Sequence, residues 1–261
     1  MAIRVVVWGE NIHDRENATV RELYPNGMHN AIADALNRQN DIEATTATLE
    51  QPGHGLSAER LAETDVLTWW GHKDHGGVDD AIVEQVVQRV WEGMGLLVLH
   101  SGHFSKVFKR LMGTPCSLTW REAGEKERVW VINRNHPIAA GLGPYFEVPQ
   151  SEMYGEPFTV PEPMETVFIS WYDGGEVFRS GLTYQRGAGR IFYFAPGHEV
   201  YPIYNDPNVQ TVLQNAVRWA HNPAAPWKDI ANAPNRPVGA ALEPIEEKGP
   251  SLHAPGEAGF R

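Results

Sequence analysis

The feature that most constrains the fold is an alternation of short apolar runs with segments of helical periodicity in the first half of the chain. The apolar runs are bounded by turn-forming residues and predict buried strands at 3–9, 42–49, 65–71 and 95–100. Apolar residues at helical spacing predict helices over 28–39, 78–93 and 104–113. Strands and helices in this order favour right-handed crossovers and a parallel sheet.

The second half of the chain is less regular. Its apolar runs predict strands at 128–133, 165–172, 176–186 and 189–197, several of them antiparallel, and a helix at 208–221. From 222 onward the sequence is rich in Pro, Ala and Gly and has no periodicity, so it cannot bury enough apolar surface to fold alone. The chain is therefore expected to form one α/β domain over 1–221 and an irregular tail over 222–261.

The composition argues against nucleic-acid and membrane partners. The formal net charge is −11, whereas a surface that binds nucleic acid or anionic lipid is basic. No apolar run reaches the roughly 18 residues of a membrane span, and no secretory signal pattern is visible. The single cysteine, Cys116, excludes an internal disulfide in this sequence. These features predict a cytoplasmic protein.

Histidines and carboxylates gather directly after the predicted strands, and one more histidine, His29, opens the helix behind the first strand. Because ligands of open parallel sheets bind beyond the carboxyl ends of the strands, these side chains are expected to meet at one edge of the sheet. The residues concerned are His13, Asp14, His29, His72, Asp74, His75, His100, His103, His198 and Glu199.

Imidazoles gathered with a carboxylate are typical of divalent-metal sites and equally of general acid–base catalysis. The carboxylate that we select is Glu152, with which Tyr154 alternates, so that both point to the same side of an extended segment. No H-E-x-x-H segment occurs, and the nucleophile-elbow, P-loop and dinucleotide-binding glycine motifs are missing from the sequence. Nucleotide-binding enzymes of the Rossmann type are therefore disfavoured.

Several segments resemble the ThuA-like (trehalose utilisation) family. They are HPIAAGLGPYFEVPQSEMYGEPF, GRIFYFAPGHE followed by QTVLQNAVRWA, the helix start MHNAIADAL and the strand end LLVLHSG, and together they cover about residues 3–221. The resemblance implies a flavodoxin-like three-layer sandwich of the class I glutamine amidotransferase type, with a mostly parallel central sheet and additional antiparallel strands. It also implies functional roles for His29, His100, Glu152, Tyr154 and His198.

One departure from the amidotransferase pattern excludes glutamine hydrolysis through a thioester. At the place of the nucleophilic cysteine the sequence reads His100-Ser101-Gly102-His103, so His100 stands where the sulfur would be. The chain is not expected to be a glutamine amidotransferase.

The trehalose connection implies a small-molecule sugar substrate and a functional link to a sugar 3-dehydrogenase that makes 3-keto-disaccharides. We expect metal-assisted cleavage of the glycosidic bond of 3-keto-trehalose, with His100, Glu152 and His198 as base and acid. A zinc or manganese ion is expected on some of His29, His103, Glu152 and His198. Substrate contacts are expected from His13, Asp14, His72, Asp74, His75 and Tyr154.

Two other functions are compatible with the same residues. A keto-sugar isomerase or hydratase would use the same base and metal without breaking the glycosidic bond. A non-catalytic sugar-binding partner of the dehydrogenase would use the histidines only as hydrogen-bonding groups and would need no metal. The tail and the strand-rich middle also make a homo-oligomer possible.

Overall fold

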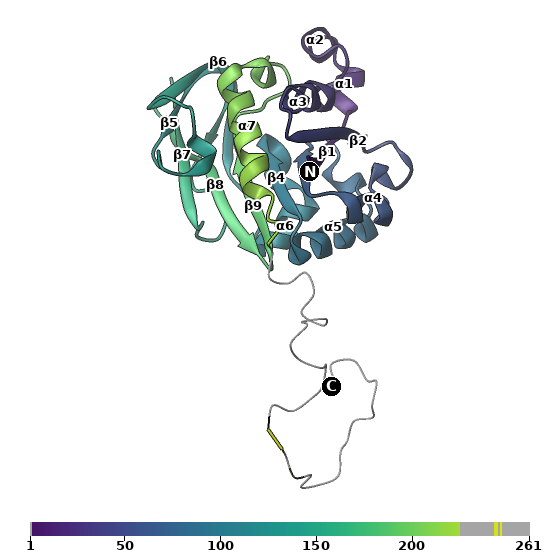
Figure 1. Ribbon diagram of the computed structural model, residues 1–261. Coiled ribbons are helices and arrows are strands. Elements are labelled where there is room, and N and C mark those ends of the chain that lie inside the picture. The colour runs from purple at the N-terminus through teal and green to yellow at the C-terminus, as the bar shows by residue number, and fades with distance from the viewer. Residues whose placement is uncertain (1, 225–242, 245, 247–261) are drawn as a thin grey trace. The chain divides into compact units, whose positions relative to one another are not determined.

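In the computed structural model, which describes residues 2–224, 243, 244 and 246, nine strands form one continuous sheet. The order of the strands is β2-β1-β3-β4-β9-β8-β7-β5-β6, and Figure 1 shows β2 and β6 toward opposite sides of the domain. The strands are β1 (Ile3–Gly9), β2 (Ile42–Thr48), β3 (Val66–Trp70), β4 (Gly95–Leu99), β5 (Thr119–Val131), β6 (Tyr145–Gly155), β7 (Glu165–Tyr172), β8 (Val177–Arg186) and β9 (Gly189–Phe194).

The sheet has a parallel half and an antiparallel half. Every pairing from β2 to β9 is parallel, and every pairing from β9 to β6 is antiparallel. This arrangement confirms the predicted α/β fold with a parallel central sheet and additional antiparallel strands. The helices are α1 (Ile12–Glu16), α2 (Ala18–Leu23), α3 (Met28–Asn37), α4 (Ala58–Glu63), α5 (Asp80–Glu92), α6 (Lys106–Met112) and α7 (Pro207–Ala220).

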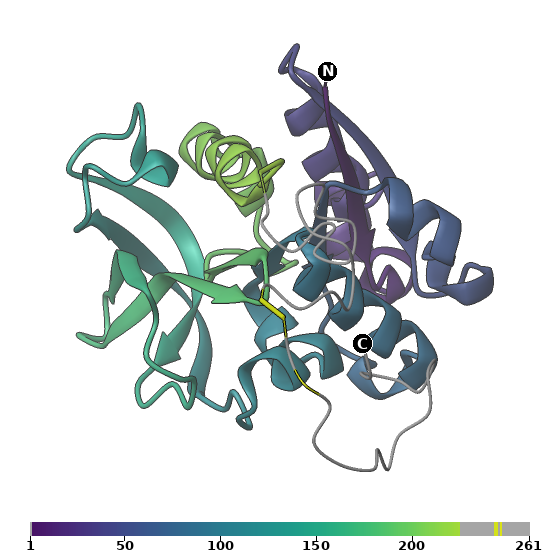
Figure 2. The same cartoon turned by 60° about the horizontal axis from the view of Figure 1, so that its bottom comes forward.

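Helices cover both faces of the parallel half and complete the three layers (Figures 1 and 2). Val5 and Val7 of β1 belong to the apolar cluster that includes residues of α3 and α7. Val6 and Trp8 of the same strand belong to the cluster that includes residues of α4, α5 and α6. Strands of this kind are apolar on both faces, which explains why the parallel half was predictable from continuous apolar runs.

The antiparallel half differs more from the sequence prediction. Strand β5 begins nine residues before the predicted start at 128. The prediction missed these residues because most of them are exposed or half-buried and show no apolar alternation. Strand β6 was not among the predicted strands, since it contains Pro149 and several polar residues and lies at the edge of the sheet. Apolar periodicity does not report a strand in which several of the buried positions, such as Ser151 and Glu152, are polar.

No helix or strand was predicted for the segment between β1 and α3, but this segment is not a simple loop. It contains the short helices α1 and α2. Asn17 caps α2 by accepting hydrogen bonds from the backbone N–H groups of Thr19 and Val20. Of the residues in α2, only Val20 is buried, so the helix shows no apolar stripe in the sequence.

Within the described residues, no helix combines the length and the apolar character that a bilayer crossing requires. The predicted irregular tail at 222–261 lies almost entirely outside the described residues. The oligomeric state also stays a prediction.

We predict that Gly189→Ala destabilises the domain where β9 begins beneath the end of α5. A methyl group at Gly189 would lie 2.1 Å from the carbonyl oxygen of Val90 and 2.8 Å from that of Met94. Because both neighbours are backbone atoms, overpacking should lower the free energy of unfolding by about 1–3 kcal/mol. Denaturant unfolding measures this loss. Gly143→Ala is the control, since its nearest neighbour would be 3.5 Å away, and equal stabilities of the two variants would contradict the prediction.

Candidate functional site

The centre of the site is His100, which directly follows β4. Its backbone adopts a left-handed conformation with φ of 47°, and a 3₁₀ turn over His100–Phe104 follows. The imidazole is buried, and its Nδ1 lies 2.7 Å from the carbonyl oxygen of Ala195, just after β9. Because a carbonyl oxygen only accepts hydrogen bonds, Nδ1 of His100 carries a proton.

The other ring nitrogen of His100 meets two side chains from β6. Nε2 lies 3.0 Å from Oε2 of Glu152 and 3.1 Å from the hydroxyl oxygen of Tyr154. The ring of Tyr154 also stacks on the imidazole, with the ring centroids 4.6 Å apart and nearly parallel. A proton on Nε2 can be donated to Glu152, and when that proton leaves, the Tyr154 hydroxyl can donate to the free nitrogen. Both protonation states of Nε2 therefore have a hydrogen-bond partner.

His198 approaches the same carboxylate from the segment after β9. The backbone N–H of Val200 donates to Nδ1 of His198 at 3.3 Å, so the proton of the neutral ring lies on Nε2. That Nε2 lies 4.0 Å from Oε1 of Glu152 and 3.8 Å from Oε1 of Glu122. Glu152 is thus flanked by two imidazoles, as the sequence analysis expected.

The neighbouring charges set the ionisation of this cluster. Burial would raise the pKa of Glu152, but the hydrogen bond from His100 and the charges of His100, His198 and His72 bring it below its ordinary value. Burial and the neighbouring His100 lower the pKa of His198 to about 4. Burial raises the pKa of Tyr154 well above its ordinary value. At neutral pH Glu152 is therefore a carboxylate, His198 is neutral, and Tyr154 keeps its proton.

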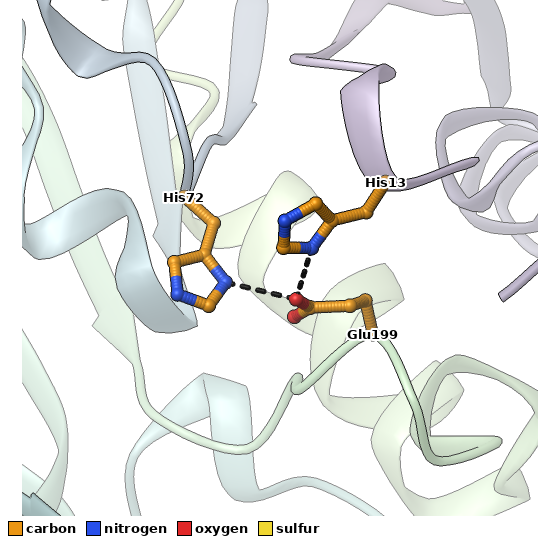
Figure 3. Close-up of side chains that lie close together, drawn as sticks. All are labelled: His13, His72 and Glu199. Atoms are coloured by element: carbon orange, nitrogen blue, oxygen red, sulfur yellow. Dashed lines mark hydrogen bonds and ion pairs between the residues drawn. The ribbon is translucent and has the colours of Figure 1, made fainter. Parts of the chain in front are cut away.

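A second cluster, formed by His13, His72 and Glu199, lies beside the first. The imidazoles come from α1 and from the turn after β3, and both point their Nδ1 atoms at Oε1 of Glu199, which follows β9 (Figure 3). The distance from His72 Nδ1 to this oxygen is 2.9 Å. The ring centroids of His72 and His198 are 6.1 Å apart, so the two clusters are neighbours.

Glu199 and His72 depend on each other electrostatically. Burial alone would raise the pKa of Glu199, but hydrogen bonds with His13 and His72 bring it far below its ordinary range. Burial opposes protonation of His72, yet the hydrogen bond with Glu199 and its negative charge raise the pKa of His72 above the ordinary value.

A cavity of about 430 Å³ opens next to both clusters. Its volume lies within the range of roughly 300–1,000 Å³ typical of small-molecule sites. Glu152 and Tyr154 reach its wall, whereas His100 and His198 are not among the residues that line it. The lining residues are His72, His75, Ser101, His103, Phe104, Ser117, Leu118, Trp120, Glu122, Glu152 and Tyr154.

The four predicted metal ligands are not gathered in one place. Among the described residues, the groups with metal-ligand geometry are His13, His72 and Glu199, and His100, Glu152 and His198. His29 belongs to neither group, because its side chain packs between Gly9, at the end of β1, and Gly27, just before α3. His103 belongs to neither, and its Nδ1 lies 2.7 Å from the carbonyl oxygen of Cys116.

The two aspartates predicted to contact substrate make local backbone contacts. Asp14 accepts a hydrogen bond from the N–H of Met28, at the first residue of α3, at 2.5 Å. Asp74 accepts one from the N–H of Gly77 at 2.8 Å. Of the other residues predicted to contact substrate, His72, His75 and Tyr154 line the cavity, whereas His13 does not. All substrate roles stay predictions.

Sequence reasoning assigned no role to Glu10, Glu122 or Trp120. The buried carboxylate of Glu10 accepts hydrogen bonds from the backbone N–H groups of His72 and Lys73, at 2.6 and 2.9 Å, and so fixes the turn after β3. Its position directly after the first strand was the available signal. Glu122 and Trp120 lie on the part of β5 that carries no apolar pattern, so no signal identified them.

Comparison with known proteins places the chain in a family. The ThuA family model, described as trehalose utilisation, matches residues 4–220, so the chain belongs to the ThuA family. This membership points to a role in the metabolism of trehalose or a related sugar. Among curated proteins, none matches the chain at a significant level.

Solved structures share the fold at low sequence identity. A ThuA-like protein from Parabacteroides merdae has a TM-score of 0.66 and 14% identity, over 85% of this chain and 91% of that one. A ThuA-like protein from Bacteroides uniformis has a TM-score of 0.61 and 17% identity, over 84% and 91%. A GMP synthase component from Thermoplasma acidophilum has a TM-score of 0.53 and 12% identity, over 84% and 94%. These similarities confirm the flavodoxin-like fold of the amidotransferase type.

We predict that His103 makes the stability of the protein sensitive to acid. Burial, with the nearby His100 and His75, lowers the pKa of His103 to about 3, against 6.5 in the unfolded chain. The unfolded state therefore binds more protons in this interval, and stability falls as the pH drops below 6.5. His103→Asn keeps a donor for the Cys116 carbonyl but cannot titrate. Between pH 7 and pH 5 it should lose up to about 2 kcal/mol less unfolding free energy than the wild type. Denaturant unfolding at both pH values measures this, and identical losses would contradict the assignment.

Proposed function

We propose that the protein is an enzyme that cleaves the glycosidic bond of a 3-keto-disaccharide, such as 3-keto-trehalose, by base-promoted elimination. The observation that carries this proposal is the placement of Glu152. It is an ionised carboxylate on the wall of a sugar-sized cavity, with an imidazole on either side. The ThuA family membership supports a sugar as the substrate.

The proposed reaction depends on the acidity of a C–H bond next to a ketone. A carbonyl group at C3 acidifies the proton on C2. Removal of that proton generates an enolate, and collapse of the enolate forms the C1–C2 double bond while the C1–O bond breaks. The departing sugar oxygen takes up a proton, so that no oxidant, reductant or water is consumed. The keto group must be supplied by a prior oxidation of the C3 hydroxyl, which is the reaction of a sugar 3-dehydrogenase.

Glu152, His198 and His100 each have a separate role in this reaction. Glu152, which lines the cavity, removes the C2 proton. His198 directs its Nε2–H toward the gap between Glu122 and Glu152, two residues of the cavity wall, and stabilises the negative charge there, while the departing oxygen takes up the proton that Glu152 removed from C2. His100 holds the Glu152 carboxylate through the 3.0 Å contact and receives or returns its proton. Positioned groups of this type contribute about 10²–10⁴-fold each to the rate.

A divalent ion is a further part of the proposal. When bound near the cavity, it would polarise the ketone and stabilise the negative charge that develops on the enolate oxygen. Two groups of side chains in the described residues offer three ligand atoms within 4.8 Å of one another.

The rim of the cavity supports recognition of a sugar ring. The side chains of Trp120 and Phe104 line the cavity and are 64% and 43% exposed. Exposed aromatic rings beside a polar cavity offer an apolar face to the C–H side of a sugar, while polar groups within the cavity bind its hydroxyls. The neutral His103 presents its unprotonated Nε2 as one such acceptor.

We predict that Glu152→Gln abolishes most of the turnover of 3-keto-trehalose. The amide keeps the volume of the side chain but cannot accept the C2 proton, so kcat should fall about 10²–10⁴-fold. Glu147→Gln, on the exposed side of the same strand, is the matched control and should keep full activity. The products are identified by NMR.

The outcomes of this experiment separate the competing functions. A cleaved sugar with an unsaturated or hydrated keto product supports the proposal. An intact disaccharide with an altered keto position or added water would indicate an isomerase or hydratase. Binding of the keto-sugar without conversion by the wild type would indicate a non-catalytic sugar-binding protein.

We predict that Trp120→Ala weakens substrate binding more than catalysis. Removal of this exposed ring should raise KM roughly tenfold, equivalent to about 1.4 kcal/mol, because the cavity loses one aromatic wall. The value of kcat and the melting temperature should stay close to those of the wild type. Trp130→Ala is the control, because Trp130 is exposed on the same strand but does not line the cavity. An unchanged KM in Trp120→Ala would remove this ring from the binding site.

A further inference from the structure

We propose that His13, His72 and Glu199 bind one divalent transition-metal ion beside the cavity. Their ligand atoms lie within 4.8 Å of one another, and both imidazoles direct Nδ1 at the Glu199 carboxylate (Figure 3). Small side-chain rotations bring such atoms to about 2 Å from a common ion. The three residues come from separate elements, so the completed fold is needed to assemble the site.

The chemistry of the donor set fits a catalytic rather than a structural metal site. Two imidazole nitrogens and one carboxylate oxygen are typical ligands of catalytic zinc, which keeps a further position for water or substrate. Manganese accepts the same mixture of nitrogen and oxygen ligands. The set contains no sulfur ligand, and the two histidine side chains are 22% and 36% exposed, which leaves a route for the ion.

A second observation is the state of the Glu199 carboxylate. Its side chain is 3% exposed, and its Oε2 atom is buried with no hydrogen-bond partner among the described residues. A buried carboxylate oxygen without a partner is costly, and coordination of a cation removes that cost. The turn that carries His72 is also held in place, because Glu10 accepts hydrogen bonds from its backbone. Such outer contacts orient the ligands of metal sites.

The tautomers of the histidines distinguish this cluster from the one around Glu152. In His198, Nδ1 accepts the N–H of Val200, so Nε2, the atom that faces Glu152, carries a proton and is not free to bind a metal. In the metal-free protein the Nδ1 atoms of His13 and His72 donate hydrogen bonds to the Glu199 carboxylate, and an ion that binds there displaces these two protons. Within the described residues the Nε2 atoms of His13 and His72 make no hydrogen bond, so each ring can keep its remaining proton on Nε2 and offer the Nδ1 lone pair to the ion.

The ion would lie next to the reacting sugar without using the proton-transfer residues. His72 lines the cavity, and its ring centroid is 6.1 Å from that of His198. An ion held by His72 can therefore reach a sugar oxygen in the cavity through its open coordination position. This assistance to catalysis rests on the proposed function, whereas the binding site itself does not.

The test measures metal binding by the full chain independently of turnover. The protein is stripped with a chelator, and ZnCl₂ or MnCl₂ is titrated by calorimetry, with metal content measured after gel filtration. The wild type should bind one ion per chain, and Glu199→Gln and His13→Ala should each weaken binding at least about tenfold, as loss of a ligand contact does. Glu152→Gln is the matched control and should bind the ion as the wild type does.

Thermal unfolding provides a second readout. The ion should raise the melting temperature of the wild type and of Glu152→Gln, but not that of His13→Ala, which changes a partly exposed helical residue and stays testable if Glu199→Gln does not fold. Absence of stoichiometric binding by the wild type would overturn the site. Loss of binding in Glu152→Gln together with retention in Glu199→Gln or His13→Ala would also overturn it. Metal binding with no cleavage of keto-sugars would contradict only the proposed function, and cleavage with no metal binding would contradict only this site.

Discussion

The parallel pairing of β4 with β9 is the contact on which the whole site depends. It joins Leu99 to Phe194 in register, although the two strands are separated by about half of the domain. Because of this register, the carbonyl of Ala195 lies against Nδ1 of His100, and His198 and Glu199 follow at the same edge of the sheet. One ladder of backbone hydrogen bonds thus brings together His100, His198 and Glu199, around which both clusters form.

The two clusters contain the same types of side chain but differ in how their protons are fixed. The carbonyl of Ala195 fixes a proton on Nδ1 of His100, and the N–H of Val200 donates to Nδ1 of His198, so that the proton of His198 lies on Nε2. The rings around Glu152 therefore suit directed proton transfer. The Nδ1 atoms of His13 and His72 converge on Glu199, and no contact within the described part of the chain prevents the Nε2 atoms of these rings from keeping a proton when an ion displaces the one on Nδ1. The carboxylate of Glu199 is therefore suited to binding a cation, and that of Glu152 to removing a proton from the substrate.

The parallel half of the fold and the meeting of His72, His100 and His198 at one edge could be predicted from the sequence. Continuous apolar runs identified β1, β3 and β4, and the rule for strand ends then placed the histidines. Glu152 was selected because it alternates with Tyr154, and the family resemblance implied its role, although β6 itself was not predicted as a strand. The pairing of His13 with Glu199 joins residues 186 positions apart and depends on side-chain directions, which periodicity does not describe. For the same reason the expected grouping of His29 and His103 with Glu152 did not appear.

The most direct test of this division is the tautomeric state of the histidines, measured by ¹⁵N NMR of the metal-free protein near neutral pH. We expect neutral His198 to carry its proton on Nε2 and none on Nδ1, and His100 to carry a proton on Nδ1. Binding of zinc should then shift the Nδ1 resonances of His13 and His72 and leave the tautomer of His198 unchanged. A proton on Nδ1 of His198, or a zinc-induced change at His100 and His198 in place of His13 and His72, would contradict it.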